Sequence, residues 1–150
     1  MAKSAKIFKA LSDETRLRLV NLLLHADEDV CVCEMVDALE LPQYQISKHL
    51  TILKNAELLQ ARRRGTWVYY QLNREESPLL RDLFKMLRRH LKQQIFTDDV
   101  ATLTQRLALR QDGKCVVGFI SGVEATQMLR RNNKTRNHVS KKTRHFHLHA

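Results

Sequence analysis

The chain has 150 residues, and its 26 Lys and Arg against 16 Asp and Glu give a formal net charge of +10. This length suits one domain with extensions and suffices for a hydrophobic core without disulfide support. No apolar run reaches the roughly 20 residues that cross a bilayer, and the first residues lack the apolar run of a secretory signal peptide. Three cysteines are an odd count and a poor disulfide framework, so we expect a cytoplasmic protein. A basic, helix-rich chain makes nucleic acid the first partner to consider.

The charge is unevenly distributed. Residues 121–150 hold seven Lys or Arg and one acid, together with four of the seven histidines. Because large apolar residues are scarce there, we expect 130–150 to be a disordered basic tail. Within the body, residues 27–40 hold six acids and no base, whereas 48–64 hold five bases and one acid. The first of these segments would attract cations, and the second would attract phosphate.

Apolar spacing predicts three helices in the first part of the chain. Ser12 is a plausible N-cap for a helix over 13–25, with acids in its first turn where the helix dipole favours them. A short helix over 32–40 follows a polar link, and Pro42 then interrupts the chain. A third helix over 43–55 has a polar start and an apolar stripe behind it. Two short helices around a Pro-containing turn indicate a helix-turn-helix.

Residues 58–72 predict a β-hairpin, because aromatic and β-branched residues flank the turn signal Gly65. A basic hairpin after a helix-turn-helix is a wing. Ser77-Pro78 opens a long amphipathic helix, with Ser as N-cap and Pro at N1. Thr97-Asp98-Asp99 resembles a second helix start, and we expect Gly113 to end that helix. These later helices have little left to cover in one small domain, so we predict that they pack on the first helix and on a second subunit.

The start of the third helix carries the residue types that read DNA. In a helix-turn-helix, the N-terminal residues of the second helix face base edges in the major groove. Glutamines can read adenine bidentately, and basic residues at the hairpin can reach phosphates or the minor groove. The plain alternative is a solvated helix face and a solvated turn. The ordered set favours DNA binding, with the candidate residues Gln43, Tyr44, Gln45, Ser47, Lys48, His49, Arg62, Arg63 and Arg64.

Cys31 and Cys33 are the candidate metal ligands. In a regular helix, residues i and i+2 point about 200° apart, whereas in extended chain they share a face. The pair therefore chelates best where the chain enters a helix, which is where the 32–40 helix begins. Thiolates select soft metals: Zn, Cd and Pb, and thiophilic As(III) and Sb(III). Two thiols fall one short of a trigonal-pyramidal As(III) or Sb(III) site, and Cys115 is the remaining cysteine. The alternative is that the cysteines are small buried apolar residues.

Enzymatic motifs are missing from the sequence. It contains no phosphate loop, nucleophile elbow or paired-carboxylate site, and no Cys–His arrangement that suggests catalysis. Single histidines on the amphipathic helices are more typical of surface or packing residues than of ligands. We therefore do not expect an enzyme or an organic cofactor.

Together these segments resemble the ArsR/SmtB family of metal-responsive winged-helix repressors over about residues 5–73. The resemblance rests on the segments Phe8–Leu19, Val30–Leu39, Gln45–Leu58 and Arg62–Tyr70. The Cys-Val-Cys-Glu sequence is most similar to the arsenic/antimony branch and to the related cadmium/lead branch. The resemblance implies a homodimer that occupies double-stranded operator DNA without inducer and releases it when metal binds.

The chain departs from this family in ways that bear on the metal site. Arsenic-branch relatives often place a third Cys where this chain has Val36, and cadmium/lead relatives supply thiols from an N-terminal arm, whereas no Cys precedes Cys31. Cys115 is then the one candidate for a third thiol, within or across subunits. The acid and His pairs of the family's zinc site are missing from 78–95, which argues against a zinc or nickel sensor. Glu57 stands where the family usually has Gly before the wing.

We therefore predict a mainly α protein with a small β-hairpin: a winged helix-turn-helix whose N- and C-terminal helices form a dimer interface. Residues 1–110 would form this DNA-binding and dimerisation domain, 111–129 an extension carrying Cys115, and 130–150 the basic His-containing tail. The predicted function is a repressor released from operator DNA by As(III) or Sb(III), with Cd, Pb and Zn as other soft inducers and no membrane partner. The alternatives are a thiol redox-sensing repressor and a metal-independent module that coats nucleic acid.

Overall fold

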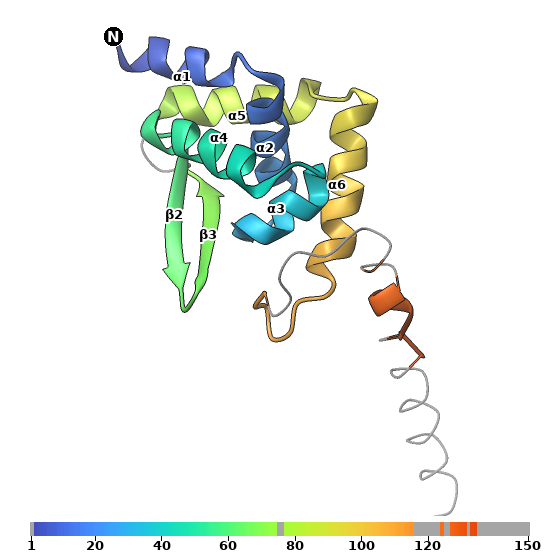
Figure 1. Cartoon of the computed structure of the whole chain (residues 1–150). Helices are drawn as coiled ribbons and strands as arrows, with labels where there is room; N and C mark the ends of the chain where they lie inside the picture. Colours follow the sequence, from blue (N-terminus) through green and yellow to red (C-terminus); the bar gives the residue numbers. More distant parts are fainter. Residues whose placement is uncertain (1, 75–76, 116–123, 125–126, 132, 135–150) are drawn as a thin grey trace, which may run out of the picture.

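The computed structural model of the chain describes residues 2–74, 77–115, 124, 127–131 and 133–134. Most of the predicted basic tail, and much of the predicted extension after Cys115, lie outside the described residues. Within them the chain is mainly helical (Figure 1). The helices are α1 (Lys3–Leu11), α2 (Glu14–His25), α3 (Val32–Leu39), α4 (Gln43–Asn55), α5 (Pro78–His90) and α6 (Gln94–Leu107).

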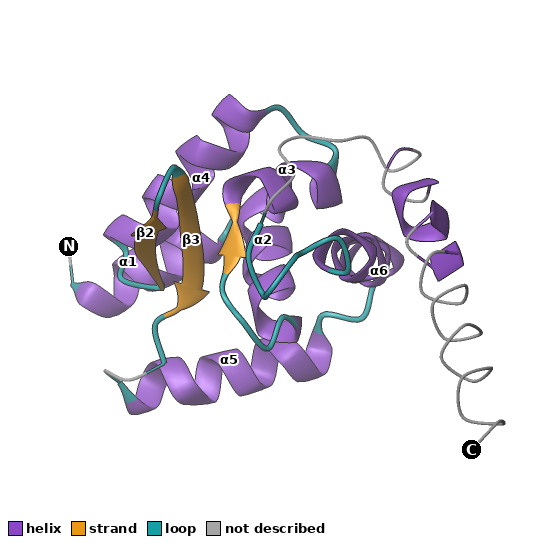
Figure 2. Ribbon diagram, turned by 90° about the horizontal axis from the view of Figure 1, so that it is seen from below, coloured by secondary structure: helices purple, strands orange, loops and turns teal. Residues whose placement is uncertain are grey.

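Three strands form one small antiparallel sheet. The predicted hairpin is confirmed as β2 (Leu59–Arg64) and β3 (Trp67–Leu72), joined at Gly65, whose φ of 60° suits a residue without a Cβ. The short strand β1 (Val30–Cys31) was not predicted, because two residues are too few to show a periodicity. It pairs with the far side of β3, with Cys31 opposite Tyr69, so that β3 lies between β1 and β2 (Figure 2). The thiol segment is thereby attached to the wing.

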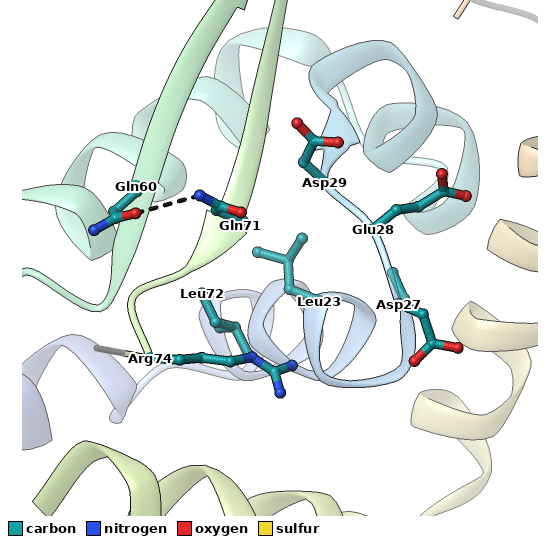
Figure 3. Close-up of a pocket in the computed structure, with 9 residues that line it drawn as sticks. Leu23, Asp27, Glu28, Asp29, Gln60, Gln71, Leu72 and Arg74 are labelled. Carbon is teal, nitrogen blue, oxygen red and sulfur yellow. Dashed lines mark hydrogen bonds between the residues drawn. The ribbon is translucent and has the colours of Figure 1, made fainter. Parts of the chain in front are cut away.

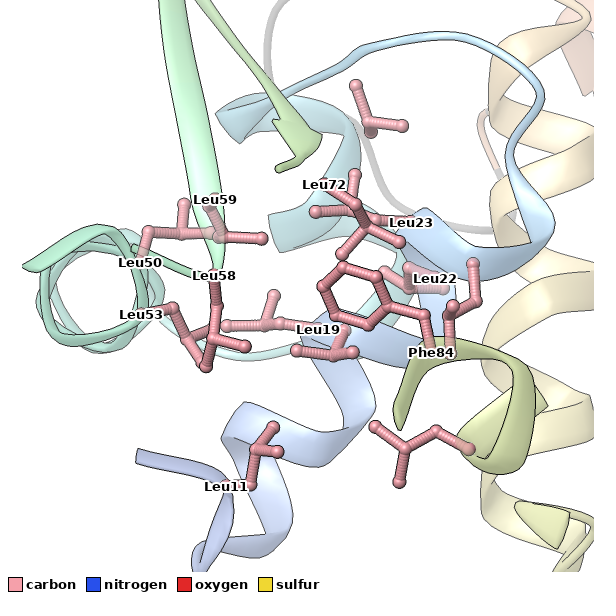
Figure 4. Packing of buried hydrophobic residues seen from close by; sticks show 14 of the residues in the cluster. Leu11, Leu19, Leu22, Leu23, Leu50, Leu53, Leu58, Leu59, Leu72 and Phe84 are labelled. Carbon is pink, nitrogen blue, oxygen red and sulfur yellow. The ribbon is translucent and has the colours of Figure 1, made fainter. Parts of the chain in front are cut away.

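The main hydrophobic core joins the helix-turn-helix to the wing and to α5. Leucines of α2 and α4 converge on the base of β2 and on Phe84 of α5 (Figure 4). Leu19, Leu50 and Leu53 have no measurable exposure, and burial of each such side chain contributes about 1.5–3 kcal/mol. This core fixes the recognition-helix candidate α4 against α2 and the wing. In the part of the chain that the structure describes, no helix is long and apolar enough to span a membrane.

Several predicted boundaries are wrong. Ser12 caps the end of α1, where its hydroxyl donates to the Lys9 carbonyl, and the N-cap of α2 is Asp13, whose carboxylate accepts from the Arg16 N–H. Helix α6 begins three residues before Thr97 and ends at Leu107, so Gly113 does not end it. Gly113 instead lies, with a φ of 71°, in a tight turn closed by the Gln111–Lys114 bridge. Helix α1 was not delimited from the sequence.

The turn before the wing is made without glycine. Glu57 adopts the left-handed conformation, with a φ of 60°, directly after α4. A Cβ makes this conformation costly, which explains why the position suits Gly. Asn73 fixes the turn from the other end of the hairpin, because its side-chain amide donates to the Glu57 carbonyl and its N–H donates to the Leu58 carbonyl. The tight turn therefore forms despite the unfavourable residue.

A buried three-thiol cluster and a candidate nucleic-acid interface

The three cysteines meet inside one chain. Their sulfur atoms all lie within 4.8 Å of one another, and those of Cys33 and Cys115 are 3.3 Å apart. All three residues are free thiols and are at most 2% exposed. Cys115 reaches the pair because the segment after α6 turns back below α3 (orange in Figure 1). All three thiols of the candidate site therefore lie together within a single chain.

The pair sits at the entry of a helix, as predicted. Cys31 ends β1 and is the N-cap of α3, and Cys33 lies in the first turn of that helix. The extended backbone of Cys31 lets its side chain share a side with that of Cys33, which a regular helix would prevent. Glu34 closes a capping box, because its carboxylate accepts from the Cys31 N–H at 2.9 Å.

Two buried arginines of the α6 region form ion pairs with α3 beside the thiols. Arg106 donates to Asp37 of α3 at 2.8 Å, and its NH2 group lies 3.8 Å from the sulfur atoms of both Cys33 and Cys115. Arg110 follows one turn later and binds Glu34 with two bonds of 2.7 Å. Both pairs are almost fully buried, with Glu34 at 0% exposure and Arg106 at 2%. They hold α6 against the start of α3.

Tyr69 of β3 connects the thiols to the wing. Its hydroxyl accepts from the Cys115 N–H at 3.0 Å, so the wing strand helps to fix the third thiol. Two guanidinium groups lie over its ring, that of Arg110 at 5.6 Å and that of Arg64, at the end of β2, at 5.2 Å from the ring centre. Trp67, the one tryptophan of the chain, also packs against the cluster.

The pKa values of the three thiols are shifted in different directions. Hydrogen bonds from Cys31 and then Cys33 lower the pKa of Cys115, and the positive charge of Arg106 acts in the same direction. The same contacts with Cys115 raise the pKa of Cys33 and raise the pKa of Cys31 to about 12. Negative charge therefore collects first on the sulfur of Cys115.

The cluster fits a soft, three-coordinate ion. Metal–sulfur bonds of about 2.3 Å at near-tetrahedral angles need sulfur atoms roughly 3.8 Å apart, which lies between the 3.3 Å of the Cys33–Cys115 pair and the 4.8 Å within which all three sulfur atoms fall. Among the described residues the cluster consists of three thiols and no imidazole, which makes a soft donor set. The chain lacks a fourth cysteine for a closed tetrahedral thiolate site. This donor set suits a trivalent ion with a lone pair.

The candidate DNA residues fall into two groups. Gln43, Tyr44 and Lys48 are exposed at the start of α4, and Gln45 and Ser47 are half-buried beside them. Arg62, Arg63 and Arg64 are exposed along β2. His49 differs, because its ring contacts Arg16 at 3.2 Å and lies 3.9 Å from Asp13. Its side chain is 19% exposed, so His49 braces α4 against α2 more than it faces solvent.

Four of the six acidic residues in 27–40 are paired with arginines and are not available to bind a metal ion. Asp29 pairs with Arg64 of the wing at 3.1 Å, Glu28 and Glu34 pair with Arg110, and Asp37 pairs with Arg106. The interpretation of residues 27–40 as a patch that attracts metal is therefore wrong for these four acids. Their charges are used to hold arginines of the wing and of the α6 region.

A surface pocket of about 370 Å³ lies beside this segment but does not contain the thiols (Figure 3). Asp27, Glu28 and Asp29 line one side, and Gln71, which donates to Gln60 across the hairpin, lines the other. None of the predicted site residues lines it.

Sequence reasoning missed Tyr69, Arg106 and Arg110 as site residues. One signal was available, because Arg106 falls three residues after Leu103 and within the apolar stripe of its helix. An arginine on the core side of an amphipathic helix requires a buried partner, which points to a carboxylate or to a site.

Comparison with known proteins agrees with this architecture. The family model of the bacterial regulatory proteins of the arsR family matches residues 13–61. The arsenic resistance transcriptional regulator ArsR1 of Pseudomonas putida is 49% identical over 69 residues, which are 46% of this chain and 53% of that protein. The arsenical resistance operon repressor of Bacillus subtilis is 40% identical over 76 residues, which are 51% of this chain and 71% of that protein. The match thus spans about half the length of the Pseudomonas relative.

A solved structure supports the fold. The homodimeric winged helix-turn-helix domain of a possible ArsR-family regulator from Mycobacterium bovis matches with a TM-score of 0.51 and 27% identity, over 61% of this chain and 81% of that one. The matched relatives are DNA-binding transcriptional regulators and not enzymes. With its helix-turn-helix, its wing and these relatives, the chain belongs to the ArsR family of transcriptional regulators.

Proposed function

We propose that the protein is a homodimeric repressor that leaves operator DNA when As(III) or Sb(III) binds Cys31, Cys33 and Cys115. The observation that carries the proposal is the convergence of these three thiols at the first helix of the helix-turn-helix. Arsenic and arsenical resistance regulators among the relatives are consistent with this inducer.

The inducer would act on both DNA-reading elements. Condensation of arsenous acid with three thiols forms three As–S bonds and releases three waters, so the sulfur atoms are drawn toward one centre. Cys31 and Cys33 form the start of α3, and Cys115 is tied to β3 through the Tyr69 hydroxyl. Movement of these sulfur atoms would therefore shift α3 relative to α4, and it would shift the wing at the same time. A coupling of about 1–3 kcal/mol between the two sites is enough to lower occupancy substantially, and operator DNA would weaken inducer binding by the same factor.

The DNA-facing surface would be the start of α4 and the wing arginines. Gln43, Tyr44 and Lys48 are exposed together on α4, which suits insertion into a major groove. A dimer would present two such helices to half-sites about 34 Å apart. Exposed apolar side chains on α1 and α5 (Phe8, Leu79 and Met86) offer a subunit interface, and the Mycobacterium neighbour is a homodimer.

The decisive test is a titration of the protein–operator complex under a non-thiol reductant. Arsenite or antimonite is expected to release the DNA, and Cys33→Ser is expected to abolish the release while leaving DNA binding intact. Fluorescence anisotropy of labelled operator DNA measures release, and Trp67 fluorescence reports the cluster directly.

The same titration tests the rivals. The sulfur atoms of Cys33 and Cys115, 3.3 Å apart, favour a disulfide as the second candidate switch. Release by peroxide alone, with no effect of arsenite, would contradict the metalloid proposal in favour of a redox sensor. Indifference to arsenite, antimonite, cadmium and peroxide, with equal binding to any duplex, would indicate the coating module.

Two substitutions separate phosphate contacts from base contacts. Arg63→Ala on the wing should weaken binding about equally for all sequences and lower the salt slope of log K by about 1, because it removes one phosphate contact. Gln45→Ala on α4 should relax sequence preference with little change in slope. Binding measured from low to high salt, on operator and on scrambled DNA, distinguishes them. Arg81→Ala on α5 is the matched control and should change neither quantity.

A further inference from the structure

Asp37 and Arg106 form a buried ion pair in contact with the thiols. Their side chains are 8% and 2% exposed, and the nitrogen and oxygen atoms are 2.8 Å apart. The guanidinium NH2 group of Arg106 also lies 3.8 Å from two of the three sulfur atoms. Asp37 therefore offsets part of the charge that Arg106 presents to the sulfur atoms.

The chemical identity of the bound ion decides the charge of the complex. Arsenous acid and three thiols give a neutral As(SR)₃ with three waters. Cd²⁺ and three thiols give an anionic [Cd(SR)₃]⁻, and three protons leave to solvent. Whatever protons the free thiols hold, the two products differ by one unit of charge. In a buried site this unit has a large effect, because surplus charge is poorly solvated there.

We propose that the Asp37–Arg106 pair makes the thiol cluster selective for trivalent metalloids over divalent thiophilic metals. The second buried arginine, Arg110, is likewise paired with a carboxylate, that of Glu34. Among the described residues, each of these two arginines thus has a negative partner that offsets the attraction it could offer to an anionic complex. A neutral trivalent complex needs no counter-charge from these residues. The inference rests on the proposed function and specifies the class of inducer.

Two variants, one that removes a negative charge and one that removes a positive charge, test the proposal. Asp37→Asn removes a negative charge beside Arg106, so cadmium affinity relative to arsenite affinity is expected to rise about 10- to 100-fold, as a nearby unit charge produces at an effective dielectric constant near 20. Arg106→Gln removes a positive charge beside the sulfur atoms and is expected to lower the same ratio. Asp99→Asn is the matched control: it also removes a buried carboxylate of an Arg pair, with Arg18 at 2.8 Å, but lies two turns earlier on α6, so the ratio should not change.

Sodium arsenite and cadmium chloride are titrated separately into the full chain under a non-thiol reductant, with Trp67 fluorescence and thiolate absorption as readouts. A purely structural role of the pair would move both affinities together and leave their ratio constant, which would overturn the proposal. Opposite shifts of the ratio in the two variants support it. If one variant does not fold, the direction of the shift in the other still decides between these outcomes. Failure of the unmodified chain to bind arsenite would instead contradict the proposed function.

Discussion

Cys115→Ser is expected to weaken arsenite binding by at least about 100-fold, because loss of a direct ligand should exceed the 10- to 100-fold cost of losing an outer-shell contact. The serine hydroxyl is a hard donor with little affinity for a soft ion. Cys115 is 2% exposed and its sulfur lies 3.3 Å from that of Cys33, so the remaining pair would form an incomplete site. Trp67 fluorescence measures the affinity, and an unchanged titration would remove Cys115 from the site.

The same cysteine allows a test of which chain supplies the third thiol. If the site is built within one chain, mixed dimers of Cys33→Ser and Cys115→Ser subunits contain no intact site and should not respond to arsenite. If Cys115 were supplied across the interface, each mixed dimer would regain one complete site. Co-refolding the two variants and titrating the mixture distinguishes the arrangements, with co-refolded unmodified chain as the positive control.

The helix-turn-helix and the wing could be predicted because their signals are local. Apolar spacing marks the stripes of α2 and α4, Pro42 marks the turn, and Gly65 with alternating aromatic residues marks the hairpin. Boundaries were less accurate where two residues compete for one role. Ser12 and Asp13 are both good caps, and only the backbone geometry shows that Asp13 begins α2.

Only part of the candidate site could be predicted from the sequence. Cys31-Val32-Cys33 at a helix entry is a local pattern, and its position is confirmed. The contact of Cys33 with Cys115 and that of Asp37 with Arg106 span 82 and 69 residues, and no periodicity predicts contacts at such distances. For this reason the acids of 27–40 were interpreted as free charge, although Arg64 and the two α6-region arginines neutralise four of them.

Arg110→Met is expected to destabilise the protein by about 3–5 kcal/mol, because it leaves the fully buried Glu34 carboxylate without its cation. Arg110 makes two 2.7 Å bonds to Glu34 and donates to the Asp29 carbonyl at 2.8 Å, so it connects the end of α6 to both sides of the thiol segment. A loss of this size is a large part of the 5–15 kcal/mol typical of a domain. Urea denaturation under reductant measures it.

A second substitution identifies the cause of that loss. Glu34→Gln added to Arg110→Met removes the unpaired charge but keeps an acceptor for the Cys31 N–H, so the double variant should be more stable than Arg110→Met alone. Arg88→Met is the matched control: Arg88 is exposed and donates to the Leu24 carbonyl at 2.8 Å, so its loss should cost no more than about 1.5 kcal/mol. If Arg110→Met cost no more than Arg88→Met, the buried pair would not hold the site together. If arsenite binds the folded thiol cluster as proposed and not the unfolded chain, arsenite at 100 times its Kd should return about 2.7 kcal/mol to any variant that keeps the three cysteines.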